Sequence, residues 1–188
     1  MRYISALLLL SILVSCSKKD NYLNSRHKPY ENDFIEVSDL QINEYAPKSS
    51  SLNEFDEKAD WIELYNPTDV ELIISTESWS LSDNENQPEK YFILACSIPA
   101  KGHLVIWCDG LDLIKRDFHA NFKLSGHGEN IGLYHNGNLI DEIVFDDEVK
   151  KNVSYGRIND GDLNWRLFES PSPGTSNQSP DNYAETIK

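Results

Sequence analysis

From Ile35 onward, the apolar residues of the chain come in short runs separated by Gly, Pro, Asn, Asp and Ser. Several of these runs alternate between apolar and polar residues, as half-buried strands do. The segments that fit this description are 37–45, 60–66, 70–74, 79–81, 91–96, 104–108, 122–124, 130–134, 139–145 and 153–157. After the N-terminal region, no segment has the apolar period of a helix. The pattern predicts an all-β domain, either a sandwich or a barrel.

One hairpin is specified by its turn. Asn136-Gly137 separates the runs 131–135 and 138–145, and Asn-Gly supplies the positive φ angles that a two-residue turn requires. In the second run, both alternating sets contain apolar residues, for example Ile143 and Val144. A strand that is apolar on both faces is expected inside a sandwich and not at its surface.

The N-terminus has the composition of an export signal. Arg2 is followed by an apolar run that ends at Val14, which is too short to span a bilayer, since a spanning helix needs about 20 apolar residues. Leu13-Val14-Ser15-Cys16 resembles the bacterial lipobox, in which the cysteine is acylated and becomes the new N-terminus. The resemblance implies a signal peptide over residues 1–15 and permanent attachment of Cys16 to a membrane through several acyl chains.

Residues 16–36 are polar and have no apolar period, so we expect them to form a lipidated flexible tether. The polar residues 179–188 are expected to be a disordered tail.

The resemblance to the lipobox predicts a place in a bacterial cell envelope, at the outer membrane. The segment Ser17-Lys18-Lys19-Asp20 lacks a long acidic run, which favours a periplasmic over a surface position.

The chain is acidic, with 31 Asp and Glu against 17 Lys and Arg and a formal net charge of −14. Loss of Arg2 with the signal would make it one unit more negative. Phosphate backbones are bound by clustered basic residues, so nucleic acid is not an expected partner.

Cys96 and Cys108 remain after Cys16 is acylated. Outside the cytoplasm they can form a disulfide, and they can equally be two buried thiols.

A series of motifs resembles the lamin tail domain family, in the right order and over residues 37–178. The motifs are Ile42-Asn43-Glu44-Tyr45, the segment 60–66, Trp79 to Asp83, Ile98 to Ile106, Phe122 to Leu124, Ile131-Gly132-Leu133, Tyr155-Gly156-Arg157, Trp165 and Ser170 to Asn177. Ser172 stands where the family has threonine. The resemblance implies an immunoglobulin-like β-sandwich, and bacterial relatives are secreted or surface modules without established chemistry.

The densest polar cluster contains Asn43, Glu44, Asp60, Glu63 and Asn66. Carboxylates in this number can coordinate Ca²⁺, and Glu44, Asp60 and Glu63 are the candidate ligands. Strand alternation splits the cluster, because it places Asp60 and Glu63 on opposite faces. The other use of these residues, hydrogen bonding to backbone and turn groups of the sandwich, therefore stays open. No other cofactor is expected.

Four histidines, His103, His119, His127 and His135, are expected to be exposed loop residues, because Gly102, Gly126, Gly128 and Asn136 beside them are loop signals. The chain contains no nucleophile elbow, zinc-protease motif or phosphate-binding glycine loop, so we expect no enzymatic activity.

Trp61 and Trp107 lie within predicted strands and are expected to be buried. Trp79 and Trp165 lie near strand ends and are the candidates for aromatic contact with a ligand.

These features predict a non-catalytic, lipid-anchored module that binds or scaffolds an envelope protein or glycan. Two alternatives stay open. One is a Ca²⁺-dependent adhesion module, and the other is an accessory domain to a separately encoded secreted hydrolase.

Overall fold

The computed structural model describes residues 40–111, 117–145 and 148–177, all within the unit Phe34–Lys188. The predicted signal peptide, Cys16, the tether and the tail at 179–188 lie outside the described residues. All regular structure in the described ranges is β-strand. These ranges contain no apolar helix of bilayer-spanning length.

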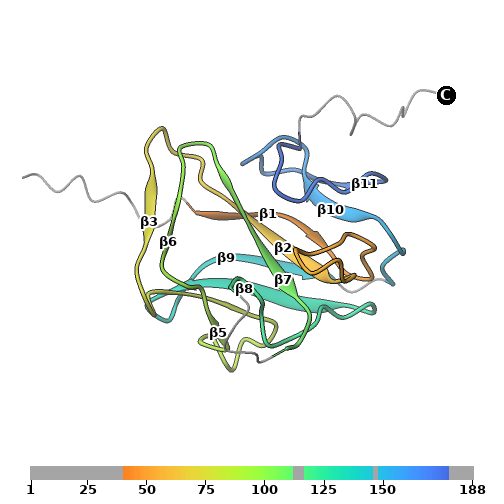
Figure 1. The fold of residues 1–188 in the computed structure, drawn as a ribbon, viewed down its shortest axis with the longest axis horizontal. Coiled ribbons are helices and arrows are strands. Elements are labelled where there is room, and N and C mark those ends of the chain that lie inside the picture. The colour runs from red at the N-terminus through yellow and green to blue at the C-terminus, as the bar shows by residue number, and fades with distance from the viewer. Residues whose placement is uncertain (1–39, 112–116, 146–147, 178–188) are drawn as a thin grey trace, which may run out of the picture. The chain divides into compact units, whose positions relative to one another are not determined.

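Two antiparallel sheets form the body of the domain (Figure 1). The first has the order β11-β10-β1-β2-β7, with the bounds β1 Gln41–Ala46, β2 Asp60–Tyr65, β7 His103–Cys108, β10 Ser154–Arg157 and β11 Trp165–Phe168. The second has the order β5-β4-β8-β9, with the bounds β4 Trp79–Ser82, β5 Tyr91–Phe92, β8 Glu129–His135 and β9 Asn138–Phe145. A separate pair joins β3 (Leu72–Ile74) to β6 (Cys96–Ile98).

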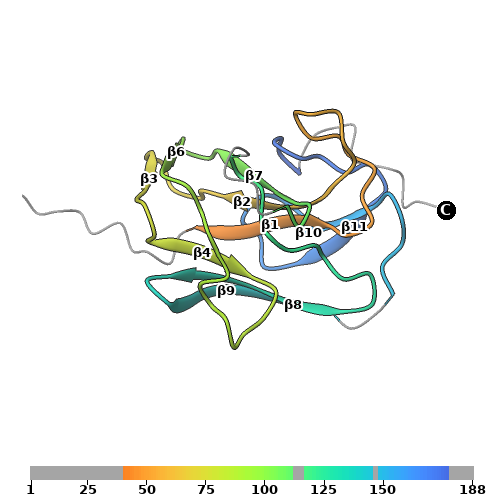
Figure 2. The same cartoon turned by 60° about the horizontal axis from the view of Figure 1, so that its bottom comes forward.

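The two sheets are stacked as layers, with β8 and β9 on one side of β1 and β10 (Figure 2). Apolar side chains from both sheets meet between them in one cluster of buried residues, which includes Ile42, Ile62, Leu64, Ile106, Leu81, Ile131 and Leu133. Sheets that pack face to face in this way bury the inner residues of each strand. The architecture is an immunoglobulin-like β-sandwich, as predicted.

The predicted hairpin is confirmed. β8 and β9 pair antiparallel from His135↔Asn138 to Glu129↔Phe145. Asn136 has φ 49° and Gly137 has φ 75°, so both turn residues are in the left-handed region that the two-residue turn needs.

The prediction that β9 lies inside the sandwich is wrong. β9 is the last strand of its sheet, and Val144 on it is 68% exposed. The sequence shows apolar residues on both faces of this strand, but it does not show that one of those faces has no covering layer.

Three other strand predictions need correction. The segment 122–124 is not a strand, although Phe122 and Leu124 are buried in the core. The segment 91–96 divides between β5 and β6, which belong to different sheets. β11 was not predicted, because its four residues form a strand by pairing with β10 and not through any alternation of their own.

Candidate functional site

Glu44 and Glu63 lie side by side on the outer face of the first sheet. The pairing of β1 with β2 shifts between Ile42 and Glu44, so Asn43 is the extra residue of a β-bulge. The bulge keeps Ile42 in the core and turns Glu44 to the opposite face, where it is the register partner of Glu63. Both glutamates are fully buried.

The segment 169–177, which we call the C-terminal strap, supplies much of the hydrogen bonding that buries these carboxylates. Glu44 accepts hydrogen bonds from the Ser172 hydroxyl (2.8 Å), from Ser172 N (3.3 Å) and from the Ser154 hydroxyl. Glu63 accepts from Gly174 N (2.7 Å) and from Asn43 Nδ2 (3.0 Å). Gly174 has φ +81°, a conformation that favours glycine at this contact.

Asp160 extends the same network. Its Oδ1 accepts hydrogen bonds from Asn43 Nδ2 (2.9 Å) and from the backbone N of Asn177 (3.0 Å). Its Oδ2 lies 3.4 Å from His103 Nε2, which is also 4.0 Å from Glu63 Oε1. Asn177, which is fully buried, donates through Nδ2 to the carbonyl oxygen of Arg157 (2.8 Å). We call Glu44, Glu63 and Asp160 the carboxylate cluster.

The members of the carboxylate cluster titrate differently. Burial raises the pKa of Glu63 to about 8, and burial also raises the pKa of Glu44. Burial acts in the same direction on Asp160, but hydrogen bonds, led by the one from His103, hold the pKa of Asp160 below its usual value. Burial acts to lower the pKa of His103, yet its contacts with Asp160 and Glu63 leave that pKa raised. The cluster therefore favours a bound proton on Glu63 and a charge on Asp160.

The predicted Ca²⁺ ligands are only partly brought together. Asp60 lies at the other end of β2, where its Oδ1 accepts from Ser49 N (3.3 Å) and its register partner is Cys108. In the part of the chain that the structure describes, no three His, Cys, Asp or Glu side chains are arranged to hold a metal ion. The contacts of Glu44 and Glu63 are those of the other use that the sequence left open, namely hydrogen bonding within the sandwich.

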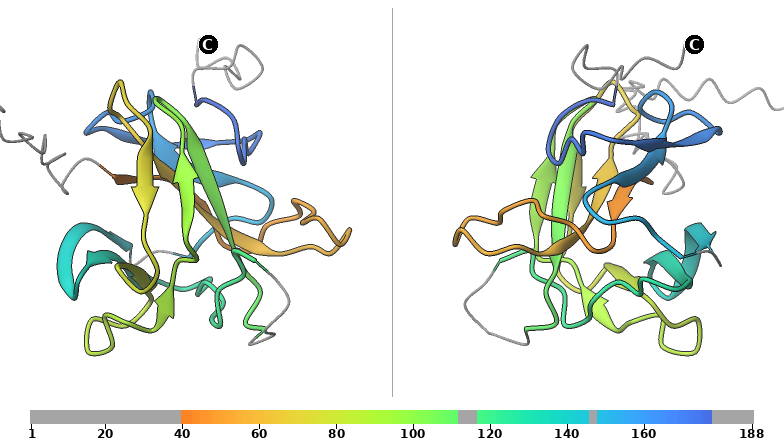
Figure 3. Two further views of the ribbon diagram at one scale, coloured as in Figure 1. Left: turned by 60° about the vertical axis from the view of Figure 1, so that its left-hand side comes forward. Right: turned by 90° about the vertical axis from the view of Figure 1, so that its right-hand side faces the viewer.

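The histidines do not all lie in exposed loops. His127 is exposed, as predicted, but His119 is only 4% exposed. Its Nδ1 lies 2.6 Å from Asp109 Oδ2 and its Nε2 lies 2.8 Å from Glu54 Oε1. Glu54 is part of the β1–β2 loop, which reaches out from the sheets (Figure 3). The sequence could not reveal this contact, because Glu54 and His119 are 65 residues apart.

The two tryptophans proposed for ligand contact have different surroundings. Trp79 is 3% exposed, and its ring lies 4.7 Å from that of His135, so it is not placed for the ligand contact for which it was a candidate. Trp165 is half-buried at the start of β11. Trp61 is buried as expected, whereas Trp107 is half-buried.

Trp165 lines an open groove between the two sheets. The groove has a volume of about 350 Å³ and is lined by Tyr45, Glu142, Ile143, Val144, Tyr155 and Trp165. We call it the aromatic groove. The Tyr45 ring is stacked with that of Tyr155 at 5.7 Å and lies 5.9 Å from that of Trp165. Rings that support one another in this way form a rigid apolar surface.

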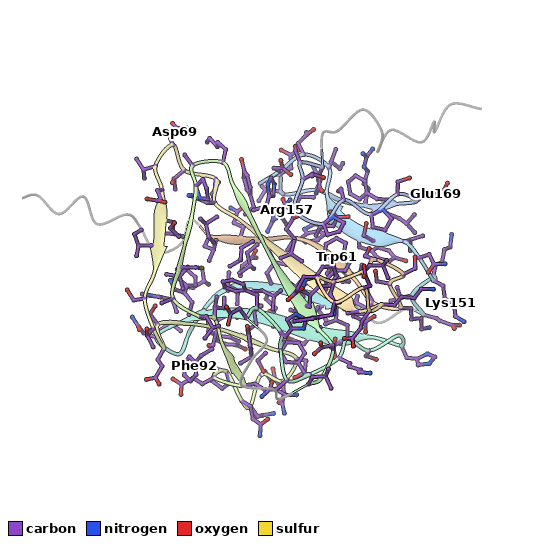
Figure 4. The ribbon with its side chains drawn as sticks, viewed as in Figure 1. Trp61, Asp69, Phe92, Lys151, Arg157 and Glu169 are labelled. Carbon is purple, nitrogen blue, oxygen red and sulfur yellow. The ribbon has the colours of Figure 1, made fainter. Side chains whose placement is uncertain are left out.

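Arg157 fixes one end of this aromatic assembly. Its guanidinium lies 5.0 Å from the centre of the Trp165 ring and 2.8 Å from Asp141 Oδ2. Asp141 also accepts a hydrogen bond from Ile42 N (2.9 Å), so it links β9 to β1. Figure 4 shows Arg157 within the body of the domain and Glu169 at its periphery.

Cys96 and Cys108 are free thiols, the first half-buried and the second buried. The two residues are not bridged in this structure, and only Cys108 is a buried thiol. Burial raises the pKa of both thiols, so they are poor nucleophiles.

The model of one family, the Lamin Tail Domain, matches residues 35–147. This is more than half of the chain. No curated protein matches it. The strands β10 and β11 lie after the matched segment and complete the first sheet by pairing β10 with β1.

Proposed function

The chain belongs to the lamin tail domain family, and from this premise we propose that it is a non-catalytic binding or scaffolding module, held by lipid at Cys16 to a membrane of the bacterial cell envelope. A fold of this kind does not itself define an activity. The proposal therefore depends on which groups of this chain are free to meet another molecule.

One contrast within the structure carries the proposal. The carboxylate cluster, which is the strongest candidate for acid–base or metal chemistry, is covered by the C-terminal strap, and its oxygens accept hydrogen bonds from Ser172, Gly174 and Asn177. The aromatic groove is open and is lined by the buried ring of Tyr45, by the half-buried rings of Tyr155 and Trp165 and by the exposed Val144. Buried carboxyl groups that accept hydrogen bonds within the domain are not available to a ligand, whereas an open aromatic surface is suited to contact.

The membrane attachment rests on the sequence alone. Ser15-Cys16 at the end of a short apolar run supports acylation, and the acidic body supports a soluble domain held away from anionic lipid. We place the domain at the outer membrane and favour its periplasmic face.

Growth with an alkyne-labelled fatty acid tests the anchor. The full-length protein is expected to carry the label and to sediment with membranes, and the Cys16→Ser variant is expected to lose both properties. Cys96→Ser is the matched control and should stay labelled. An unlabelled protein that keeps residues 1–15 and remains in the soluble fraction would refute the anchor. Protease treatment of intact cells then distinguishes the two faces of the membrane.

A cation-dependent adhesion module is a second candidate, favoured by the side-by-side placement of Glu44 and Glu63. If Ca²⁺ binds the folded protein, it must raise the melting temperature. A melting temperature that is the same with Ca²⁺ and with a chelator would remove this candidate. A role as accessory domain to a separate hydrolase would be supported by a hydrolase that binds the purified protein.

A further inference from the structure

β9 has a free edge beside the aromatic groove. It pairs with β8 on one side and has no strand on the other in the described sheets. Near its middle, the Asp141 side chain ties it to β1 through Ile42 N and to β10 through Arg157, and it also accepts a hydrogen bond from Glu142 N. Beyond that tie, the remaining residues of β9 line the groove through Glu142, Ile143 and Val144. A free strand edge offers backbone N–H and C=O groups to another extended chain.

The side chains along this edge are unusual for a solvent-facing strand. Val144 is 68% exposed, and Leu139 on the same strand is also exposed. The adjoining groove is lined by Tyr45, Tyr155 and Trp165, whose rings contact one another. Its volume of about 350 Å³ is within the range of pockets that enclose ligand groups. Edge and groove together can therefore accept a backbone and one of its apolar side chains.

The charges indicate which kind of chain would fit. Arg157 is paired with Asp141, whereas the Glu142 carboxylate at the groove is exposed and accepts a hydrogen bond from the neutral amide of Asn130. The whole chain has a net charge of −14. A second copy would bring an equal negative charge to the same edge, so charge disfavours self-association and favours a basic partner.

We propose that β9 binds an extended, basic peptide segment of another protein, which pairs with the strand edge, places an apolar side chain in the aromatic groove and places a Lys or Arg beside Glu142. This inference rests on the proposed function as a binding module and names its surface and its partner chemistry.

A random octapeptide library displayed on phage tests the inference with the full-length chain in detergent. Enriched sequences are expected to alternate apolar residues with Lys or Arg. A synthetic copy of the most enriched peptide should then bind Val144→Lys about tenfold more weakly than the unaltered protein, because the new ammonium group blocks the groove and repels the peptide. Ile73→Lys is the matched control, since Ile73 is 61% exposed on β3, and its affinity should be unchanged.

Glu142→Lys gives an independent readout. It should reverse the selection from basic to acidic sequences, while the exposed Glu71→Lys on another part of the surface should not. The melting temperatures of the variants verify that each is folded. Three results would overturn the inference: no enrichment above detergent micelles alone, equal binding to Val144→Lys, or a dimer of the unaltered protein that Val144→Lys dissociates.

The outcomes separate this inference from the proposed function. An acylated, membrane-bound protein that enriches no peptide would remove only the peptide site. A soluble, unacylated protein that still enriches basic peptides would remove the lipid anchor and leave the peptide site in place.

Discussion

At the residue scale, Glu63 combines complete burial with a hydrogen bond to each of its oxygens, from Asn43 and from Gly174. Burial of a carboxylate disfavours its charged form, and each donor partly compensates. Glu44 is in the same position on the neighbouring strand. Two ionised glutamates at this distance would also repel one another, so protonation of this pair favours the folded state.

The stability of the domain should therefore fall as the pH rises from 5 to 9. The pKa of Glu63 is about 8 in the folded protein against 4.5 ordinarily, so its contribution is complete below the ordinary value and is lost as the pH rises through the raised one. The raised pKa values of Glu44 and His103 act in the same direction. The lowered pKa of Asp160 contributes stability that is lost only at acid pH, as its carboxylate takes up a proton.

Urea unfolding at pH 5, 7 and 9 measures this effect. Between pH 5 and pH 9, Glu63→Gln should reduce the loss in the free energy of unfolding by an amount on the order of a few kcal/mol, because glutamine cannot ionise. Glu71→Gln, at an exposed position, should leave the dependence unchanged. If Glu63→Gln and the unaltered protein have parallel pH profiles, Glu63 does not titrate as proposed.

Ser172→Ala should reduce the free energy of unfolding by about 1–3 kcal/mol, because it leaves a buried carboxylate oxygen of Glu44 without the hydroxyl that donates to it. Ser172→Thr keeps the hydroxyl, and threonine stands at this position in the family pattern, so its stability should be close to that of the unaltered protein. Equal losses for both variants would mean that packing, and not the hydrogen bond, determines the effect.

At the element scale, the bulge in β1 and the C-terminal strap create the buried cluster. A regular β1 would place Ile42 and Glu44 on one face, and the extra residue at Asn43 separates them. Nothing in the amino-acid composition of β1 predicts this bulge. The sequence of the strap, rich in Ser, Pro and Gly, predicts only a loop. Strand alternation was sufficient to place Glu63 and Asp60 on opposite faces of β2. It could not predict that Gly174 of the strap would contact Glu63.

Gly156 on β10 lies close to Asn177 of the strap. A Cβ at this position would lie 2.9 Å from Asn177 Nδ2 and 3.0 Å from Glu44 Cγ. Gly156→Ala should therefore displace the strap and cost about 1–3 kcal/mol of stability in chemical unfolding. At Gly126 an added Cβ meets the flexible end of Lys48, so Gly126→Ala is the control with a smaller cost. A Gly156→Ala protein of unchanged stability would show that the contact is not tight.

At the scale of the whole molecule, alternation and turn chemistry were sufficient for the fold class and for the hairpin at Asn136 and Gly137. They failed where long-range contacts decide the outcome. β11 exists because β10 pairs with it, and β9 is an edge strand because no other described strand than β8 pairs with it. His119 is buried where Asp109 and Glu54 contact its ring. The aromatic groove combines β1, β9, β10 and β11, so of its rings only Trp165 could be proposed from sequence.

The proposed function depends above all on contact through the aromatic groove beside β9 at the envelope. A photo-crosslinking amino acid placed at position 144 of the full-length protein, in cells that make it naturally, tests that claim directly. We expect a crosslinked protein of defined mass in the membrane fraction from position 144 and none from position 73, which is equally exposed on β3. No product from position 144, or the same products from both positions, would contradict the account.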